Sequence, residues 1–456
     1  MGVRTVLMSG AVATVAAFTI LPVAGAAAAD LPKSMQLILK ELKISDDILA
    51  GSEGEHQVPA AWLKDARKQG KVKIVSSWKS KGFEKFTAPF RERYPFIKLE
   101  NWRGTKYDRG LKPLLAYRSG SHIADVVISI AAFYNQMKAG GALEDLRDLP
   151  NFKNLPKPYR DDGGLWIGQK LTYRCITYNT AKVKKSDLPK TWDDLLKGDR
   201  WKGGRLALNN YPHSWLLPLW GMKGEDWAKG FVRGLFALSP QFRKEGQTAS
   251  VSLAAAGEFD AVIMGSGHRT RQYLDKGAPV GFHCPEPVPV GPAQMAMIKG
   301  SPRAAASKIF VNWFLSKEGQ IAQYWAMAET PVHKDLHRKE FLAFPDQALG
   351  KTPAFRYQHL VDTETPKLVK FWNAMWSKGT GEIVERFSGR VKAAKRGGRR
   401  IVVDHKGMDR TVKVSGSRTK IVVDGMENDR KAVKVGMTCD IAFLVKDKEA
   451  KEMICK

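Results

Sequence analysis

From residue 71 onward short apolar strands alternate with helices, and this alternation restricts the chain to few architectures. We predict strands at 71–76, 97–102 and 124–129, with helices at 83–93 and 108–118. The run ADVVIS at 124–129 is short and apolar, as expected for a parallel strand that is buried on both faces. Such alternation indicates a parallel sheet that is covered by helices and binds ligands at the carboxyl ends of its strands.

A second α/β unit follows a polar, proline-rich segment. Its predicted strands are 170–178, 204–209 and 257–264, with a long helical stretch at 214–236. With 456 residues the chain is too long for one ordinary domain, so we expect two or three. Its 43% hydrophobic and 26% charged residues exclude a disordered or collagen-like polymer.

The first 29 residues have the pattern of a cleaved signal peptide. Arg4 supplies the positive start, residues 5–29 carry no charge, and three alanines precede Asp30. A membrane-spanning helix is the alternative, but glycine and alanine dominate the second half of the segment. The first cysteine is Cys175, so no lipid anchor is expected near the cleavage site. We therefore expect export to the periplasm.

The four cysteines have no metal-ligand spacing, and we predict neither a metal site nor a cofactor. Cys439 and Cys455 lie close enough in sequence for a disulfide that staples the C-terminal module. Cys175 and Cys284 fit buried thiols as well as a disulfide.

The C-terminal part has a composition of its own. A basic, glycine-broken stretch ends in RGGRR, and then IVVD at 401–404 recurs as IVVD at 421–424, an offset of 20 residues. VKV at 412–414 likewise recurs as VKV at 433–435, an offset of 21. Strands that alternate with Asp, Gly and Asn turns predict two hairpins, 401–404 with 412–414 and 421–424 with 433–435, and a further strand at 440–445. Residues 385–456 contain 19 Lys or Arg and 10 Asp or Glu, a net charge of +9, so 28 − 9 = +19 lies elsewhere. We expect a structural or docking module, with no nucleic-acid partner, because few aromatics are interleaved with the charges.

Several ordered segments resemble one family. They are KVKIV at 71–75, ADVVIS at 124–129, TWDDL at 191–195, AMIKGSP at 296–302, NWFLSKEGQ at 312–320 and TPVH at 330–333. Over residues 60–384 the chain resembles extracellular solute-binding proteins of bacterial ABC importers, with the type 2 periplasmic binding fold and its ferric-iron-like branch.

The resemblance implies a two-lobed α/β fold with hinge strands, extended by the small antiparallel β-domain. The expected boundaries are 1–29 for the signal peptide, 30–70 for a helical lead, 71–170 and 293–384 for lobe 1, 171–292 for lobe 2, 385–400 for a basic linker and 401–456 for the β-domain. The lobes would close on a solute and present it to a membrane permease. We expect a monomer and no enzymatic activity.

Loops after strands and the starts of helices nominate the solute contacts. These positions are Ser76, Ser77, Trp78, Trp102, Arg103, Ser129, Arg174, Asn210, Tyr211, His213, Ser214, Ser266, Gly267, His268 and Arg269. For the polar residues the alternative is turn or capping chemistry, and for the two tryptophans it is core packing.

The iron-binding relatives carry neighbouring tyrosines in the second lobe, and this chain departs from that pattern. The equivalent turn reads Gly267-His268-Arg269-Thr270, and no two tyrosines are adjacent anywhere. An arginine there favours a carboxylate or phosphorylated solute over bare ferric iron. Ferric iron, or an iron–anion complex, stays the alternative, and Arg269 and Arg271 are also compatible with a solvated basic face.

Enzyme motifs are absent from the sequence. It contains no H-E-x-x-H, G-x-S-x-G or P-loop pattern. A secreted α/β hydrolase and a polyanion-binding envelope protein remain as further alternatives. Turnover of a bound ligand would mark the first, and affinity that falls steeply with salt would mark the second.

Overall fold

The computed structural model describes residues 31–380, 384–445 and 448–456. The predicted signal peptide lies outside these residues. In the described part of the chain, no helix combines the length and the apolar character needed to cross a membrane.

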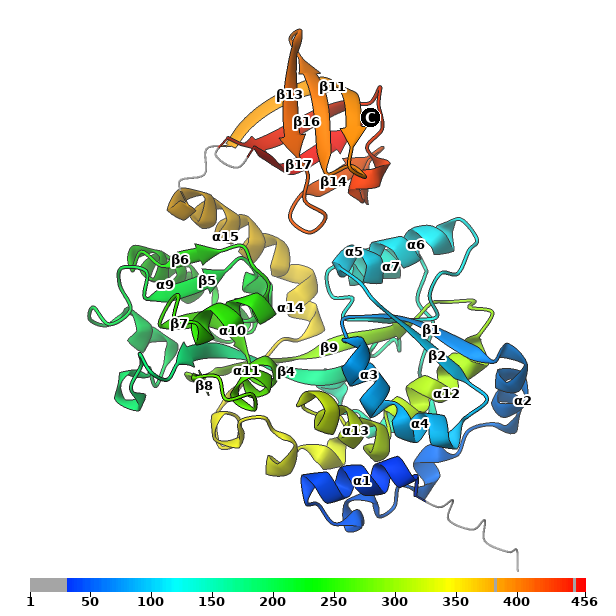
Figure 1. Cartoon of the computed structure of the whole chain (residues 1–456). Coiled ribbons are helices and arrows are strands. Elements are labelled where there is room, and N and C mark those ends of the chain that lie inside the picture. The colour runs from blue at the N-terminus through cyan, green and yellow to red at the C-terminus, as the bar shows by residue number, and fades with distance from the viewer. Residues whose placement is uncertain (1–30, 381–383, 446–447) are drawn as a thin grey trace, which may run out of the picture. The chain divides into compact units, whose positions relative to one another are not determined.

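A ten-stranded sheet connects two groups of parallel strands (Figure 1). Its main path runs β2-β1-β3-β9-β4-β7-β5-β6, while β8 pairs with β4 and β10 with β9. The strands are β1 (Lys71–Ser76), β2 (Lys98–Arg103), β3 (Val126–Ile128), β4 (Ile167–Asn179), β5 (Leu206–Asn209), β6 (Gln241–Arg243), β7 (Ala261–Ser266), β8 (Val280–His283), β9 (Val288–Met297) and β10 (Pro353–Phe355). The long strands β4 and β9 pair antiparallel and join the two groups. The predicted two-lobed α/β fold with hinge strands is confirmed.

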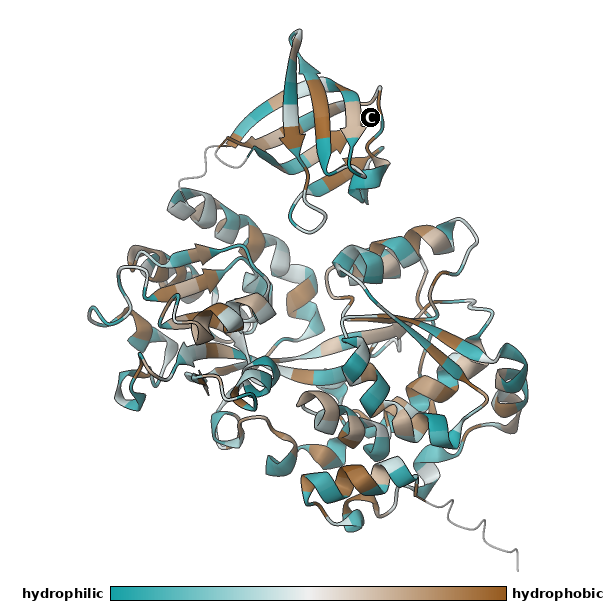
Figure 2. Ribbon diagram, viewed as in Figure 1, coloured by the Kyte–Doolittle hydropathy of each residue, from teal (hydrophilic) through white to brown (hydrophobic). Residues whose placement is uncertain are grey.

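Lobe 1 contains the parallel strands β1, β2 and β3 and nine helices. They are α1 (Lys33–Leu42), α2 (Ala60–Gln69), α3 (Ser80–Phe86), α4 (Ala88–Arg93), α5 (Lys106–Arg109), α6 (Leu111–Arg118), α7 (Tyr134–Ala139), α12 (Ala304–Phe314) and α13 (Lys317–Met327). The helix predicted at 83–93 is two helices, because Pro89, which has no N–H, begins a new first turn in α4. In Figure 2 the strands of the sheet carry brown segments among pale and teal ones, and the helices carry both brown and teal segments.

Lobe 2 contains β5, β6 and β7 with α8 (Leu216–Lys223), α9 (Glu225–Ala237), α10 (Gln247–Ala255) and α11 (Gly267–Leu274). The capped start predicted at Thr191 is a short 3-10 helix, Trp192–Leu196. Two later helices, α14 (Gln358–Thr363) and α15 (Thr365–Thr380), also belong here.

The position of α15 differs from the prediction, which assigned residues 293–384 to lobe 1. The buried residues Leu368, Trp372 and Trp376 recur every four positions along α15 and form one apolar stripe. This stripe joins the core of lobe 2, where the rings of Trp215 and Trp372 lie 6.1 Å apart. The burial of these large side chains attaches α15 to lobe 2.

The C-terminal module is a separate seven-stranded sheet in the order β13-β12-β11-β16-β17-β14-β15, with a further pairing of β13 and β17. Its strands are β11 (Val384–Lys395), β12 (Arg400–His405), β13 (Met408–Lys413), β14 (Lys420–Val423), β15 (Met426–Asn428), β16 (Thr438–Leu444) and β17 (Glu449–Cys455). The first predicted hairpin is β12–β13, which is antiparallel. In the second, β14 pairs antiparallel with β15 at 426–428 and not with the predicted segment 433–435. The strand β17 in addition pairs in parallel with β13 and β14.

Two predictions for this module were wrong. Residues 385–400 are mostly not a linker, because β11 pairs with both β12 and β16 and buries Phe387 and Val391. Residues 433–435 are not a strand; they follow a short 3-10 helix, Arg430–Ala432.

Two disulfides are present among the described residues. Cys439 and Cys455 face each other on β16 and β17 and form the disulfide that the sequence predicts as one alternative. Cys175 and Cys284, which the sequence left open, are also paired.

Candidate anion-binding site at the hinge strands

Side chains on β4 alternate between two environments where the strand joins the lobes. Leu171 and Tyr173 line one cavity, so Thr172 and Arg174, at intervening positions, lie on the opposite face. Two buried polar atoms on that face, Thr172 Oγ1 and Arg174 Nη1, have no hydrogen-bond partner among the described residues. Because buried polar groups are nearly always satisfied, this face of β4 is suited to a polar ligand.

Arg174, which the sequence nominated, lies at the centre of a group of cationic side chains. Burial lowers the pKa of its guanidinium from the ordinary value, and the neighbouring Arg356 and Arg269 lower it further. Placing like charges together in this way costs free energy, which an anion bound between them would offset.

Arg356 was missed by the sequence reading. Its backbone N–H donates to the carbonyl of Val290 at 2.9 Å, and its Nη2 donates to the carbonyl of Pro292 at 2.5 Å. Both acceptors are on β9, and the side chain lies over Gly291 between them. Arg174 and Arg356 are therefore held by the two strands that join the lobes.

Lys170 adds no net charge, because it is paired with Glu329. The carboxylate of Glu329 also accepts from Trp78 Nε1 at 3.3 Å and from Gln323 Nε2 at 2.8 Å. His268 Nε2 lies 3.9 Å from the same carboxylate. Glu329 thus accepts three hydrogen bonds from within the protein.

The same contacts settle the position of Trp78. Its side chain is 1% exposed and packs against Phe83, Phe86 and Phe314. The structure corrects the nomination of Trp78 as a solute contact: it is a core residue.

His213 and Tyr211 border the cationic group from lobe 2. Burial lowers the pKa of His213 to about 4, with further lowering by Arg356, Arg174 and Lys106. The imidazole is therefore neutral near pH 7 and offers one donor and one acceptor. Tyr211 contacts it ring to ring, with centroids 6.3 Å apart.

On lobe 1, Ser77 and Ser129 form a pair of hydroxyls. Their Oγ atoms are 3.2 Å apart, and the N–H of Ser129 donates to the carbonyl of Gln294 on β9. Ser129 has a left-handed backbone, with φ of 60°, an uncommon conformation for a side chain other than glycine. Neither serine is exposed.

The remaining nominated residues are mostly engaged elsewhere. Internal hydrogen bonds join Ser76 to Asn101, Asn210 to Trp372, Ser214 to Tyr211, Ser266 to His268 and Arg269 to Gln272. Trp102 and Arg103 are exposed at the end of β2, and Trp102 is 49% exposed. The structure does not bring these two into contact with Arg174. Their contact with a solute stays a prediction.

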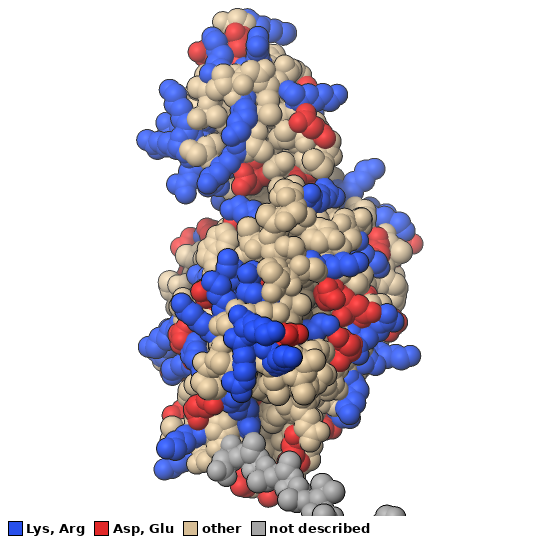
Figure 3. Space-filling view, turned by 90° about the vertical axis from the view of Figure 1, so that its right-hand side faces the viewer, with Lys and Arg blue, Asp and Glu red and all other residues tan. Residues whose placement is uncertain are grey.

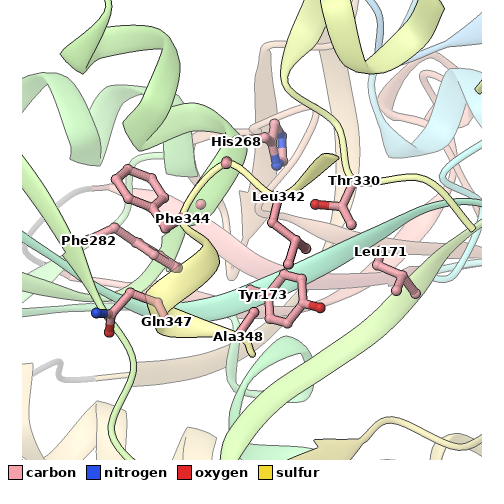
Figure 4. Close-up of a pocket in the computed structure, with 11 residues that line it drawn as sticks. Leu171, Tyr173, His268, Phe282, Thr330, Leu342, Phe344, Gln347 and Ala348 are labelled. Atoms are coloured by element: carbon pink, nitrogen blue, oxygen red, sulfur yellow. The ribbon is translucent and has the colours of Figure 1, made fainter. Parts of the chain in front are cut away.

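A cavity lies on the other face of β4 (Figure 4). Leu171, Tyr173, Phe282 and Phe344 supply most of its apolar lining, together with the nominated pair Gly267 and His268. No Lys or Arg is among the lining residues, and the imidazole of His268 is neutral, so this cavity is unsuited to an anion. The pKa of His268 is lowered well below its ordinary value by burial and by Lys170 and Arg269.

No group of three or more His, Cys, Asp or Glu side chains that could hold a metal ion occurs among the described residues. Lys and Arg side chains are spread over the face of the molecule in Figure 3, with fewer Asp and Glu among them, in line with the net charge of +28. The candidate site is therefore cationic within a cationic protein.

Comparison with known proteins gives a consistent result. Residues 112–346 match the family of bacterial extracellular solute-binding proteins. The chain is 28% identical over 208 residues to iron uptake protein A1 of Synechocystis sp., a match that covers 40% of this chain and 56% of that protein. The chain thus spans little more than half of that relative's length.

Solved structures share the fold. Iron-bound HitA from Pseudomonas aeruginosa has a TM-score of 0.51 at 19% identity, over 68% of this chain and 98% of that one. AfuA from Actinobacillus pleuropneumoniae, with fructose-6-phosphate bound, has a TM-score of 0.55 at 20% identity, over 68% and 99%. With a family match over more than half of its length and two lobes joined by β4 and β9, this chain belongs to the bacterial extracellular solute-binding proteins.

Proposed function

We propose that this protein is the periplasmic substrate-binding component of an ABC importer, and that it captures a small organic anion, a carboxylate or a phosphorylated compound. The observation that carries the proposal is the unpartnered, buried Nη1 of Arg174 beside Arg356. Guanidinium groups bind carboxylate and phosphate oxygens through two parallel hydrogen bonds. The free Oγ1 of Thr172 supplies a further polar contact on the same face.

The charge balance supports an anion. Arg174, Arg356 and Arg269 are cationic, while Lys170 and Glu329 neutralise each other. One bound dianion would offset most of this charge. A bare ferric ion would meet repulsion instead, and hard cations need several oxygen ligands.

The proposed capture has two stages. Arg174 and Arg356, anchored on β4 and β9, first hold the anion. The lobes then move about these strands and bring Ser77 and Ser129 of lobe 1 toward His213 of lobe 2. This movement encloses the solute. A permease would recognise the closed form. This order requires no cofactor.

Relatives named for iron give the competing function. Iron uptake protein A1 and iron-bound HitA are similar to this chain, and AfuA is named with a sugar phosphate. A binding experiment has to separate these two solute classes.

The test is calorimetric titration of ligand-stripped protein with citrate, with fructose-6-phosphate and with ferric salt. We expect one of the anions to bind and ferric salt alone to give no heat of binding. Arg174→Gln should weaken anion binding about 100-fold, since it removes charge-assisted hydrogen bonds at a buried group.

The matched control is Arg271→Gln. Arg271 is on the same helix as Arg269 but is exposed and paired with Asp275 at 2.7 Å. The Arg271→Gln substitution removes one positive charge, as Arg174→Gln does. It should leave the affinity for the anion within about twofold of the wild-type value, because surface ion pairs contribute little. Ferric binding without an anion, or equal weakening by both substitutions, would overturn the proposal.

A further inference from the structure

Most of the residues that line a second cavity, which is cationic, belong to the C-terminal module. It is lined mainly by the loop 414–418, the end of β13, the β11–β12 turn and the 3-10 helix that begins at Arg430. Among the described lining residues, Arg399, Lys413, Arg418 and Arg430 are cationic and Glu449 alone is acidic.

Arg430 is held in place from two sides. Its Nε donates to the carbonyl of Gly397 at 3.1 Å. Its guanidinium fills the space beside Gly416, where an added Cβ would lie 2.0 Å from Nη1. A guanidinium fixed in this way loses little further freedom when it binds an oxyanion.

The acidic residue does not cancel the charge of Arg430. Both oxygens of Glu449 accept from Arg418, from Nε at 2.9 Å and from Nη2 at 2.7 Å. This bidentate pair neutralises itself. Arg399, Lys413 and Arg430 then leave an excess of positive charge around the cavity.

The loop between these cations has hydroxyl groups and an ordered turn. Ser415 Oγ accepts the N–H of Ser417 at 3.3 Å and of Arg418 at 3.2 Å. The hydroxyl of Ser417 is also part of the lining. Hydroxyl donors among cationic side chains match the several oxygens of a tetrahedral oxyanion.

We propose that this cavity is a second anion site, which binds a phosphate group independently of the hinge site. The group would belong either to a phosphorylated solute or to a phospholipid headgroup. Residues 384–456 contain no Trp or Tyr, and the two Phe rings, Phe387 and Phe443, are buried. No aromatic ring is therefore available for base stacking, which disfavours nucleic acid as the ligand.

Hydrogen–deuterium exchange of the full-length protein with inorganic phosphate tests the site. Peptides that cover 413–419 report the module, and peptides that cover 170–175 report the hinge in the same sample. We expect phosphate to slow exchange at 413–419. Arg430→Gln and, separately, Lys413→Gln should raise the phosphate concentration needed by about tenfold.

The matched control is Lys406→Gln, which removes the same charge at the far end of the β12–β13 hairpin, between His405 and Met408. It should leave the response at 413–419 unchanged. The proposal would be overturned if phosphate did not slow exchange at 413–419, or if all three substitutions weakened the phosphate response equally. It would also be overturned if heparin slowed exchange there and phosphate did not.

Co-sedimentation separates the two sources of phosphate. Vesicles of phosphatidylcholine, with or without phosphatidic acid, are mixed with the wild type and with Arg430→Gln. Pelleting that requires both phosphatidic acid and Arg430 identifies a lipid headgroup. Protection by inorganic phosphate without pelleting identifies a soluble phosphorylated ligand; either result supports the site.

Discussion

Arg356 packs directly against Gly291: an added Cβ on Gly291 would lie 2.8 Å from the Cβ and 3.0 Å from the Nε of Arg356. Real Cβ atoms do not approach other carbons this closely, so any larger residue at 291 requires Arg356 to move. Arg356 can therefore occupy its place in the proposed hinge site only because residue 291 of β9 is a glycine.

We predict that Gly291→Ala weakens anion binding about tenfold, since it displaces one arginine but leaves Arg174 in place. Stability should fall by about 1 to 3 kcal/mol, the usual effect of overpacking. Calorimetric titration and urea unfolding measure the two effects. The control is Gly230→Ala on α9, where an added Cβ has no neighbour within 4 Å; it should leave affinity unchanged. Wild-type affinity in Gly291→Ala would contradict the role of Arg356.

The two disulfides should differ in their effect on stability. Cys175–Cys284 spans 109 residues and Cys439–Cys455 spans 16. In the loop-entropy model, closing loops of these lengths contributes about 4.7 and about 3 kcal/mol. We expect the Cys175→Ala/Cys284→Ala double variant to lower the free energy of unfolding more than Cys439→Ala/Cys455→Ala does. Denaturant unfolding measures both, and the reverse order would show that contacts other than loop closure dominate.

The pH dependence of stability should carry a contribution from His213. Its pKa is lowered from 6.5 to about 4, chiefly by burial. Between these values the unfolded chain binds a proton that the folded protein does not. The contribution of His213 to stability is therefore complete above pH 6.5 and is lost as the pH falls toward 4, by at most about 3 kcal/mol.

Urea unfolding at several pH values checks this prediction in the wild type and in His213→Gln. The variant should lose stability less steeply between pH 6.5 and pH 4. His56 and His268, whose pKa values are also lowered, contribute equally to both proteins. Parallel curves over this range would show that His213 titrates normally.

Local patterns in the sequence were enough to predict the alternation of strands and helices, the strand that carries Arg174, and the first hairpin of the module. Each depends on residues that are close together in sequence. Arg356 could not be found this way, because it is 182 residues from Arg174 by number and acquires its role only where β10 pairs with β9. No motif around it marks a binding residue.

The errors have the same physical origin. Trp78 follows a strand, as a binding residue would, but two phenylalanines of α3 and one of α12 pack against it. Residues 385–400 have a composition typical of a linker, but the basic side chains alternate with buried Phe387 and Val391 in a paired strand. Burial by partners far away in sequence decided both positions.

The attachment of Arg174 to β4 and of Arg356 to β9 has a kinetic consequence. If the lobes rotate about these strands, the two arginines keep their positions, so the attraction for an anion is already present before closure. Their charge should then govern the rate of association and its dependence on salt. Groups on the lobes, such as Ser77 and His213, would act after encounter and set the lifetime of the complex. Speed of capture and duration of retention would thus be adjustable by separate substitutions.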